Sequence, residues 1–405
     1  MEKKKIVIIG AGFAGLRLAR KLNNHPKYSV TLIDRYNFHQ FQPLFYQVAT
    51  ARIEPSSISF PLRKIFQKSK NVSVRLTKVL NINREKNEVE TTIGNFSYDY
   101  LVVATGCTTN FFGNEKIAEN AFPMKSTYEA ITIQNRLLTN FESAYSSTPD
   151  ELEEILNIVV VGGGPTGVEL SGSIIELKTH ILPKDYPDMD FSKLQVYLLE
   201  GSPTLLGPMS KESQQKSQEF LESMGVNVWT NARVTDYDGH VIELTDGRKI
   251  KTRNLIWAAG VTGNAPSGII EQEKMQRGNR IPVDRLNRVL GEKNIFAIGD
   301  IAYMETPKYP NGHPQLANVA INQALNLARN FDRFAKGVTP DQMELFEYKD
   351  PGSMATVGKN KAVVDLPKLS FQGRIAWFVW MFLHLMLILS VRCLLYTSDA
   401  ADDSL

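Results

Sequence analysis

The chain has 405 residues, more than a single hydrophobic core usually accommodates, so we expect two or more domains. Its apolar fraction of 43% and charged fraction of 22% are those of a globular protein and exclude a disordered chain. A net charge of +3 without a dense basic stripe excludes a nucleic-acid-binding protein, and two cysteines, Cys107 and Cys393, exclude a disulfide framework or a four-ligand zinc site.

The first predicted element is a short buried strand that leads into a glycine-rich loop and a helix. Residues 5–15 read KIVIIGAGFAG. In such a loop the first glycine allows a tight turn, the second lets a pyrophosphate approach the backbone, and the third lets the helix pack on the strand. Gly10, Gly12 and Gly15 therefore predict a dinucleotide site. The apolar run at residues 6–9 is too short for a signal peptide, so we expect a cytoplasmic start.

The next two predicted strands carry further features of such a site. The strand predicted in SVTLIDR (residues 29–35) ends at Asp34, close to the spacing of about 20 residues at which a carboxylate binds a ribose hydroxyl. The alternative for Asp34 is a solvated carboxylate at a strand end. YDYLVVATG, residues 98–106, is a strand that ends in a turn of small residues.

Residues 157–167, NIVVVGGGPTG, repeat the pattern of the first strand and glycine loop. Gly162, Gly164 and Gly167 take the places of the three loop glycines, and again a strand precedes the loop and a helix follows it. Two dinucleotide sites on one chain predict a relay between two cofactors. A duplicated scaffold with one inactive site is the less favoured interpretation, because neither copy has lost a glycine.

The second copy also has a strand-end carboxylate, Glu200, which is the last residue of QVYLLE; a loop insertion precedes this strand. A carboxylate there accepts hydrogen bonds from a ribose 2′-hydroxyl and repels a 2′-phosphate. Gly201 supplies no arginine to offset that repulsion, so NADH is favoured over NADPH. A solvated strand-end carboxylate is again the alternative.

Two later strands, LIWAAGV (residues 255–261) and NIFAIGD (residues 294–300), complete the pattern. Together with GAGFAG and YDYLVVATG they resemble the FAD-binding signature of flavoprotein reductases with two dinucleotide domains. The resemblance implies that Asp300 bonds the ribityl or phosphate region of the flavin. It also implies an α/β fold with two doubly wound, Rossmann-like domains, the NADH domain being inserted into the FAD domain.

Within that superfamily the chain resembles the type II NADH:quinone oxidoreductases, which are single-subunit NADH dehydrogenases that do not pump protons. The specific stretches are FQPLFYQVAT (41–50), GGGPTGVELSG (162–172), IWAAGVTGN (256–264), GDIA (299–302), PQLANVAINQA (314–324) and GSMATVGKNKAVVDL (352–366). The implied domains are an FAD-binding part at 1–115, an NADH-binding domain at 116–262, a second FAD-binding part with the quinone-site helix at 263–345, and a C-terminal membrane-anchoring segment at 346–392.

The resemblance implies a set of ligand-contacting residues. For FAD these are Gly10, Gly12, Phe13, Ala14, Gly15, Asp34, Ala104, Thr105, Gly106, Asp300 and Ala317, and for NADH they are Gly162, Gly164, Pro165, Gly167, Glu200, Ala259 and Gly260. For the quinone they are Asn318, Asn322, Gln323 and Lys361, although a solvated lysine is the favoured interpretation of Lys361. No metal site is expected.

The quinone-site helix departs from the family pattern, which usually reads A-Q-x-A-x-Q-Q. This chain has Ala317, Asn318, Ala320, Asn322 and Gln323. Because asparagine is one methylene shorter than glutamine, a hydrogen bond to a quinone carbonyl must be re-aimed by roughly an ångström or pass through water. The alternative is that Asn318 and Asn322 are surface amides without a ligand.

Hydride transfer requires little acid–base machinery, because the cofactors carry the reactive atoms. His39 and His313 are therefore interpreted as structural. Quinone reduction takes up two protons, and Glu169 resembles the family glutamate near the flavin. We treat Glu169, with Gln323, as a catalytic candidate, in nicotinamide contact or proton relay. Stabilisation of the helix N-terminus by its charge is the alternative for Glu169.

Cysteine usage separates this chain from neighbouring families. Disulfide reductases require a redox pair near the flavin, and sulfide:quinone oxidoreductases require persulfide-forming cysteines. Only Cys107 lies in the body of the chain, so we exclude both activities.

Residues 375–391, IAWFVWMFLHLMLILSV, predict a membrane-associated helix. Seventeen residues are at the lower limit for a spanning helix, which needs about 20. Arg374, Trp377, Trp380 (or Met381) and His384 recur at helical spacing and suit a headgroup region, so an interfacial anchor is favoured over a span or a core helix. We expect a peripheral protein on the cytoplasmic face of the cell membrane, with the lipid surface and a membrane quinone as partners; a homodimer is left open.

The last residues, CLLYTSDAADDSL (393–405), neither continue the apolar helix nor cap it. Their codons can be written as the end of a transposon-based sequencing adapter. We therefore expect the native sequence to differ after Arg392 and Cys393 to have no function.

The resemblance thus implies NADH:quinone oxidoreduction through FAD, serving respiratory-chain entry and NAD⁺ regeneration. Two rival functions remain. One is an FAD-dependent NADH reductase of a soluble protein acceptor, such as rubredoxin or ferredoxin. The other is a non-enzymatic flavoprotein that senses NADH. The hydrophobic segment at 375–391 disfavours both rivals.

Overall fold

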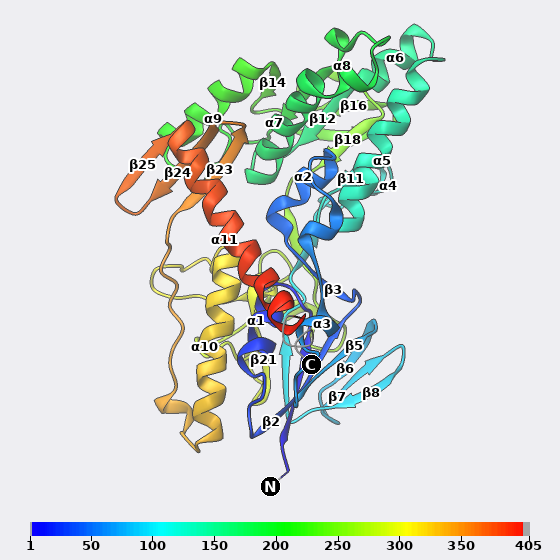
Figure 1. Cartoon of the computed structure of the whole chain (residues 1–405). Helices are drawn as coiled ribbons and strands as arrows, with labels where there is room; N and C mark the ends of the chain where they lie inside the picture. Colours follow the sequence, from blue (N-terminus) through cyan, green and yellow to red (C-terminus); the bar gives the residue numbers. More distant parts are fainter. Residues whose placement is uncertain (1, 400–405) are drawn as a thin grey trace.

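The computed structural model describes residues 2–399, with side chains to residue 388. It contains two parallel sheets, and the first glycine loop follows a strand of the first sheet (Figure 1). Its strand order is β21-β9-β1-β2-β5, formed by β1 (Lys4–Ile9), β2 (Tyr28–Asp34), β5 (Val72–Leu76), β9 (Tyr100–Val103) and β21 (Ile295–Ala297). Helices α1 (Phe13–Lys21) and α10 (Ala317–Ala335) pack together on one face. The antiparallel meander β6 (Val79–Asn83), β7 (Glu88–Thr91) and β8 (Gly94–Ser97) contributes to the core on the other.

The second sheet repeats this plan. Its order is β11-β18-β12-β13-β14, formed by β11 (Phe122–Pro123), β12 (Asn157–Val161), β13 (Gln195–Leu199), β14 (Val226–Trp229) and β18 (Asn254–Trp257). All of β12 is buried, as expected for a parallel strand covered on both faces. Helices α5 (Thr127–Ala144), α6 (Pro149–Leu156), α7 (Pro165–His180) and α9 (Lys211–Met224) and the meander β15 (Val234–Tyr237), β16 (Val241–Leu244) and β17 (Lys249–Lys251) complete this domain.

The second domain is inserted into the first. Strand β10 (Cys107–Thr109) leaves the first domain and β19 (Val261–Gly263) returns to it, and the two pair antiparallel where the chain crosses. Strand β21 then completes the first sheet beside β9. This arrangement confirms the predicted α/β fold with one doubly wound domain inserted in the other.

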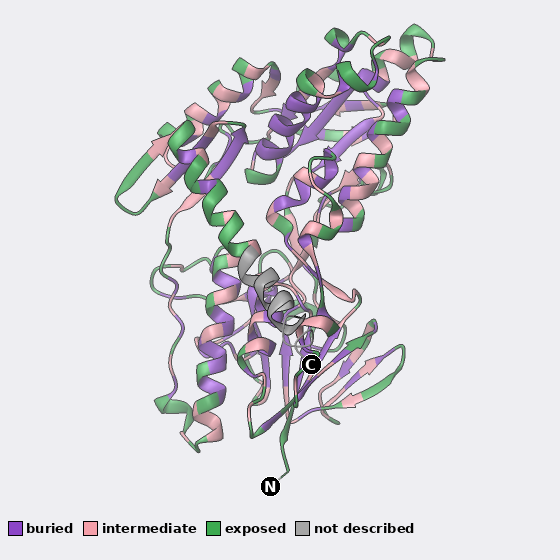
Figure 2. Ribbon diagram, in the orientation of Figure 1, coloured by how far each residue is buried: buried purple, intermediate pink, exposed green. Residues whose placement is uncertain are grey.

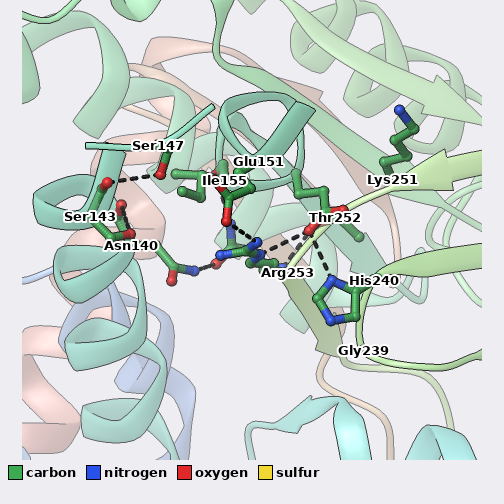
Figure 3. A network of polar contacts seen from close by, with 12 residues as sticks. Asn140, Ser143, Ser147, Glu151, Ile155, Gly239, His240, Lys251, Thr252 and Arg253 are labelled. Atoms are coloured by element: carbon green, nitrogen blue, oxygen red, sulfur yellow. Dashed lines mark hydrogen bonds and ion pairs between the residues drawn. The ribbon is translucent and has the colours of Figure 1, made fainter. Parts of the chain in front are cut away.

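A network of polar contacts lies at the end of the second sheet that is opposite its glycine loop (Figure 3). Asn254 begins strand β18, and its side chain accepts a hydrogen bond from Asn140 of α5 and donates one to the carbonyl of Ile155 at the end of α6. Beside it, Glu154 accepts from the Arg253 guanidinium at 2.8 Å and lies 2.9 Å from the His240 ring. These contacts hold α5, α6 and the meander on the sheet, which is a structural role.

Within residues 346–392, for which the sequence predicts a membrane-anchoring segment, a small sheet precedes the helix. Strands β23 (Ser353–Gly358), β24 (Lys361–Leu366) and β25 (Leu369–Gln372) pair antiparallel and pack on α7 and α9. The Asp365 carboxylate accepts from the Ser210 amide and hydroxyl and from the Ser213 hydroxyl, at the N-terminus of α9. The C-terminal sheet is therefore attached to the inserted domain.

Helix α11 (Arg374–Asp399) runs from this sheet toward the first domain, where it contacts the short helix α3 (Leu62–Ile65) (Figure 1). Its described part is largely exposed (Figure 2). Phe378 is 55% exposed and Phe382 is 64% exposed, whereas Ala376 and Trp380 are buried. Among the residues that the structure describes, no helix combines the length and apolar character that a membrane crossing requires.

The helix also continues through residues 393–399, so the expectation that the chain after Arg392 does not extend it is wrong for those residues. A helical backbone requires only compatible propensity, which this stretch has once the preceding turns are formed. The rest of the predicted adapter-derived tail, residues 400–405, lies outside the described residues.

Candidate functional site

The first glycine loop has the geometry that a bound dinucleotide requires. Gly10 has a φ of +99°, and a side chain there would meet the carbonyl oxygen of Ala104 at 2.4 Å. A Cβ at Gly15 would lie 1.8 Å from the carbonyl oxygen of Gly10, so α1 approaches β1 more closely than a side chain allows. Gly12, in contrast, faces open space, with no atom within 4 Å of its Cβ position.

The second loop reproduces each of these features. Gly162 has a φ of +115° and lies against the backbone of Ala258 and Ala259, and a Cβ at Gly167 would lie 1.9 Å from the carbonyl oxygen of Gly162. Gly164 again faces open space. Phe13 and Pro165 are the first residues of α1 and α7, so both helices point their N-termini at this space.

The two strand-end carboxylates are held by the loops rather than solvated. Asp34 accepts a hydrogen bond from the Ala11 amide at 2.7 Å and from the Tyr36 amide at 2.8 Å. Glu200 accepts from the Gly163 amide and from the Ser202 amide, both at 2.6 Å. In both loops the anchoring amide follows the first glycine. The solvated alternative that the sequence left open for Asp34 and Glu200 is therefore wrong.

Both loops fit a dinucleotide. Neither Gly12 nor Gly164 caps its helix with a side chain, and neither helix has an acidic residue in its first turn, so the first N–H groups are free for a pyrophosphate. The turn after β9 adds the Thr105 hydroxyl, which is buried without a hydrogen-bond partner among the described residues. Ala104 and Gly106 flank it in the same turn, and Ala259 and Gly260 form the matching turn after β18. These residues fit FAD at the first loop and NADH at the second.

Asp300 lies in the turn after β21, close to the crossing strands. Its carboxylate accepts a hydrogen bond from the Cys107 thiol at 3.0 Å, and its carbonyl accepts one from Gln315 at 3.1 Å. Burial and the Asp300 charge raise the pKa of Cys107 to about 12, so this thiol is neutral at physiological pH. No local sequence pattern indicates this contact, because the two residues are 193 positions apart.

The structure changes the interpretation of Gln323. Its side chain is buried, and its amide oxygen accepts from the Gly299 amide at 2.7 Å. Gln323 thus holds the Gly-Asp turn in place, and its expected catalytic, quinone-contacting role stays a prediction. The Gln323 amide oxygen thus satisfies the buried Gly299 N–H, which would otherwise lack a hydrogen-bond partner.

The other expected quinone residues lie on α10 and on β24, and their contact with a quinone stays a prediction. Asn318 and Asn322 are exposed on α10, and the Asn322 amide donates to the Asn318 carbonyl at 2.7 Å, as a surface amide does. Ala317 begins this helix. The Lys361 ammonium lies 3.5 Å from the Ser223 hydroxyl of α9, so this side chain is directed to α9 and not to the α10 amides.

Glu169 lies in a buried pocket that three other elements complete. It is 9% exposed on α7, and its carboxyl accepts from the Thr356 amide of β23 at 3.4 Å. Tyr46 of α2 (Phe45–Ala49) and Trp380 of α11 are its other neighbours. Burial raises the pKa of Glu169 to about 8, and the Thr356 amide and the Trp380 indole oppose this rise.

Tyr46 and Trp380 were not among the predicted site residues. Tyr46 lies within the stretch FQPLFYQVAT, which the sequence marks as specific without indicating a contact. Trp380 was assigned to a stripe of headgroup-facing residues, yet it is only 5% exposed and belongs to the core that contains Phe41, Tyr46 and Val357. Helical spacing shows which residues share a face of the helix, but it does not show whether that face packs on the protein or on the membrane.

The two histidines in question have structural positions. The His39 ring is buried and lies 2.9 Å from the Ala11 carbonyl, and burial lowers the pKa of His39 to about 4. The His313 ring is buried 2.9 Å from the Met304 carbonyl, and burial lowers its pKa as well. Within the described part of the chain, no group of three His, Cys, Asp or Glu side chains could hold a metal ion.

Two family models match the chain. Residues 4–324 match pyridine nucleotide-disulphide oxidoreductases, and residues 351–405 match the NDH2 C-terminal domain. Among individual proteins, the chain is 36% identical to the type II NADH:quinone oxidoreductase Ndh of Mycobacterium tuberculosis, over 96% of this chain and 86% of that protein. It is 28% identical to the type II NADH:quinone oxidoreductase of Haemophilus influenzae, over 95% and 93%.

Solved structures have the same fold. NDH2 from Plasmodium falciparum in complex with NADH superposes with a TM-score of 0.88 at 22% identity, covering 98% of this chain and 97% of that one. The sulfide:quinone oxidoreductase of Aquifex aeolicus superposes with a TM-score of 0.72 at 20% identity, covering 96% and 92%. The likeness to both extends over the two dinucleotide domains.

Proposed function

The chain belongs to the type II NADH:quinone oxidoreductases, and from this membership we infer that it oxidises NADH and reduces a quinone. The observation that best supports this activity is the duplicated loop geometry. Each loop has one glycine packed against a carbonyl oxygen, one glycine facing open space, and one carboxylate anchored on a loop amide. Two such sites on one chain suit two dinucleotides, FAD and NADH, that exchange a hydride.

The residues of the chain bind and orient the cofactors. When bound, FAD supplies the capacity to accept a hydride from NADH and to return two electrons to the quinone. The N-termini of α1 and α7 bind the pyrophosphates, and Asp34 and Glu200 keep lone pairs for the ribose hydroxyls. Asp300 and the Thr105 hydroxyl bind the flavin side near the crossing strands.

Glu169 supplies a proton. Its buried position favours the neutral carboxylic acid, because desolvation disfavours the charged form. With a pKa of about 8, Glu169 is mostly protonated at neutral pH, so it can donate a proton to a quinone oxygen that takes up electrons. This position in the pocket supports the proton-relay role over helix stabilisation, since a neutral group does not interact with the helix dipole as a charge does.

The basic experiment is a spectrum and an assay of the purified protein. We expect a flavin absorbance spectrum that NADH bleaches and that a soluble quinone analogue restores. A protein without flavin, or a reduced flavin that quinone does not reoxidise, would contradict the proposal. The same assay with NADPH tests the predicted preference for NADH.

Glu169→Gln separates the two halves of the reaction. We expect NADH to reduce the flavin at the wild-type rate, while reoxidation by quinone slows by about 10²-fold or more, since general acid catalysis contributes about that much. In the wild type, reoxidation should slow as the pH rises through about 8, because Glu169 then loses its proton. A wild-type profile that stays flat across this range would argue against Glu169 as the proton donor.

Membrane attachment through α11 is part of the proposed function. The exposed apolar side of α11 would lie on the membrane surface, on the cytoplasmic side, so that the enzyme reaches a membrane-dissolved quinone without pumping protons. Such a peripheral attachment agrees with the exposure of Phe378 and Phe382. The mass of the detergent-solubilised protein distinguishes a monomer from the homodimer that the sequence left open.

A further inference from the structure

Helix α11 has two sides with different surroundings. One side carries the exposed Phe378 and Phe382, and the other carries Ala376 and Trp380, which are 0% and 5% exposed. Since Ala376 and Trp380 are four residues apart, they lie on one face, one turn from each other. The C-terminal helix therefore contributes a buried side chain to the interior of the protein.

Trp380 is held firmly in this position. The His384 ring stacks on the indole with 4.1 Å between ring centroids, and its Nδ1 lies 2.8 Å from the Trp380 carbonyl. The His384 ring in turn meets the edge of Phe41 at 6.3 Å. These contacts connect α11 with the stretch that contains Phe41 and Tyr46.

The indole N–H of Trp380 has no hydrogen-bond partner among the described residues, although it is buried. A buried donor without a partner costs about 1–3 kcal/mol, so its retention requires an explanation. The Glu169 carboxyl lies next to it, close enough for the indole to favour the ionised form. A carboxyl oxygen accepts hydrogen bonds in both protonation states, and it accepts more strongly when Glu169 carries a charge.

We propose that Trp380 is a positioning residue for Glu169: its indole N–H binds the carboxylate whenever Glu169 has released its proton. In the described structure the indole N–H is buried without a hydrogen-bond partner, so it is free to bind the carboxylate. The ionised carboxylate accepts it, and the charge-assisted bond holds the group in the pocket until a proton returns. Because the donor is on α11, the same helix that would contact the membrane also shapes the proposed quinone site. This inference rests on the proposed proton transfer by Glu169.

Other groups around Glu169 do not replace Trp380 in this role. From β23 the Thr356 amide is already a donor to the carboxyl, at 3.4 Å. From α2 the Tyr46 hydroxyl accepts a hydrogen bond from Gln47, and burial raises the pKa of Tyr46, so the phenol stays neutral. On α7 itself Glu176 forms an ion pair with Arg52. On α11 burial lowers the pKa of His384, so this ring adds no charge in the alkaline range.

Trp380→Phe tests the proposal, because it removes the N–H and keeps an aromatic ring. The matched control is Trp377→Phe, which removes an indole N–H on the same helix where Trp377 packs beside Ala362 and Val364. The first readout is the infrared band of the neutral Glu169 carboxyl in the flavin-loaded enzyme, identified by its loss in Glu169→Gln and followed against pH. The second is the pH dependence of flavin reoxidation by a soluble quinone analogue.

We expect the Glu169 titration to move upward by about one pH unit in Trp380→Phe, because the lost bond stabilised the charged form. The descending limb of reoxidation should move with it, while Trp377→Phe titrates like the wild type. Coincident titrations of Trp380→Phe and the wild type would overturn the proposal.

Two further measurements keep this test decisive. If Trp380→Phe does not fold, 3-benzothienylalanine at position 380 removes the N–H at almost unchanged shape. If wild-type flavin is not reoxidised by quinone, the proposed function fails, whereas the infrared titration still decides whether Trp380 binds ionised Glu169.

Discussion

At the scale of single residues, the glycine loops and their carboxylates form two nearly identical constructions. In each loop the third glycine faces the carbonyl oxygen of the first at a distance that no side chain tolerates. In each, a carboxylate from the next strand binds the amide that follows the first glycine. Because the two loops have the same contacts, a substitution in one loop can be compared with the corresponding substitution in the other.

The glycines of the second loop have separable roles. Gly167→Ala should destabilise the protein by about 3 kcal/mol, because its Cβ would lie 1.9 Å from the Gly162 carbonyl oxygen and α7 would have to move. Gly164→Ala should leave the free energy of unfolding nearly unchanged, since nothing lies within 4 Å of its Cβ, but should raise the KM for NADH. Denaturant unfolding and steady-state kinetics measure both. Equal stability of the two variants would contradict the role assigned to Gly167.

Glu200→Gln tests the choice of nicotinamide cofactor. Glutamine has one acceptor oxygen where Glu200 uses two, so either the Gly163 or the Ser202 amide would face an NH₂ group. We expect weaker NADH binding and an NADH/NADPH preference narrowed by about 1–3 kcal/mol. Competitive kinetics with the two cofactors give this value.

Asp34→Asn is the matched control for Glu200→Gln, because Asp34 has the corresponding contacts in the first loop. It should lower FAD retention and leave the cofactor preference unchanged. If Glu200→Gln kept the wild-type preference, the carboxylate would serve only to anchor the loop.

The spacing of the sequence identifies the loop glycines and their carboxylates, whereas it does not identify the contacts around Glu169, for a physical reason. Loop glycines are dictated by local backbone geometry, which leaves a readable spacing. The contacts of Gln323 with Gly299 and of Trp380 with Glu169 join distant segments, and no local pattern records them. Even the predicted amides of α10 were placed on the right helix, but their partners were not foreseeable.

At the scale of elements, the C-terminal sheet is more closely tied to the inserted domain than its sequence suggested. A stretch with basic residues before an apolar helix reads as membrane-facing, yet β23 packs along α7 and Asp365 binds the N-terminus of α9. Three successive residues of β24 are buried, Ala362, Val363 and Val364, and no local pattern in the sequence indicates the surface that covers them. The closest approach is at Gly172 of α7, whose Cβ would lie 1.6 Å from the Val357 carbonyl oxygen.

Gly172→Ala should therefore separate β23 from α7. We expect a loss of about 2 kcal/mol in the free energy of unfolding, because the backbone of β23 has to shift. Since Thr356 precedes Val357 and donates to Glu169, the shift should also slow flavin reoxidation by quinone. Gly207→Ala is the control, because no atom lies within 4 Å of its Cβ position. Unchanged stability and reoxidation in Gly172→Ala would show that the sheet adapts without disturbing the pocket.

At the scale of the whole molecule, α11 joins the two domains. It begins at the C-terminal sheet on the inserted domain and reaches α3 and Phe41 of the first (Figure 1). The sequence predicted an apolar helix here and an interfacial anchor, but not that the inner face completes the Glu169 pocket. Deleting the helix would therefore remove Trp380 and any membrane contact together, and the two functions could not be told apart.

Substitutions on the outer face avoid this ambiguity. Phe378 and Phe382 are 55% and 64% exposed, and neither belongs to the buried cores of the described chain. Burying each phenylalanine in a lipid interface would contribute about 1.5–3 kcal/mol, so Phe378→Asp with Phe382→Asp should lower vesicle binding by a factor of about 100 or more. FAD content and turnover with a water-soluble quinone analogue should persist, because Trp380 and Glu169 are untouched. Ile93→Asp, at a position that is 58% exposed on the distant β6–β8 meander, should bind vesicles like the wild type. Vesicle co-sedimentation measures the binding, and wild-type binding by the double variant would show that α11 does not hold this protein on the membrane.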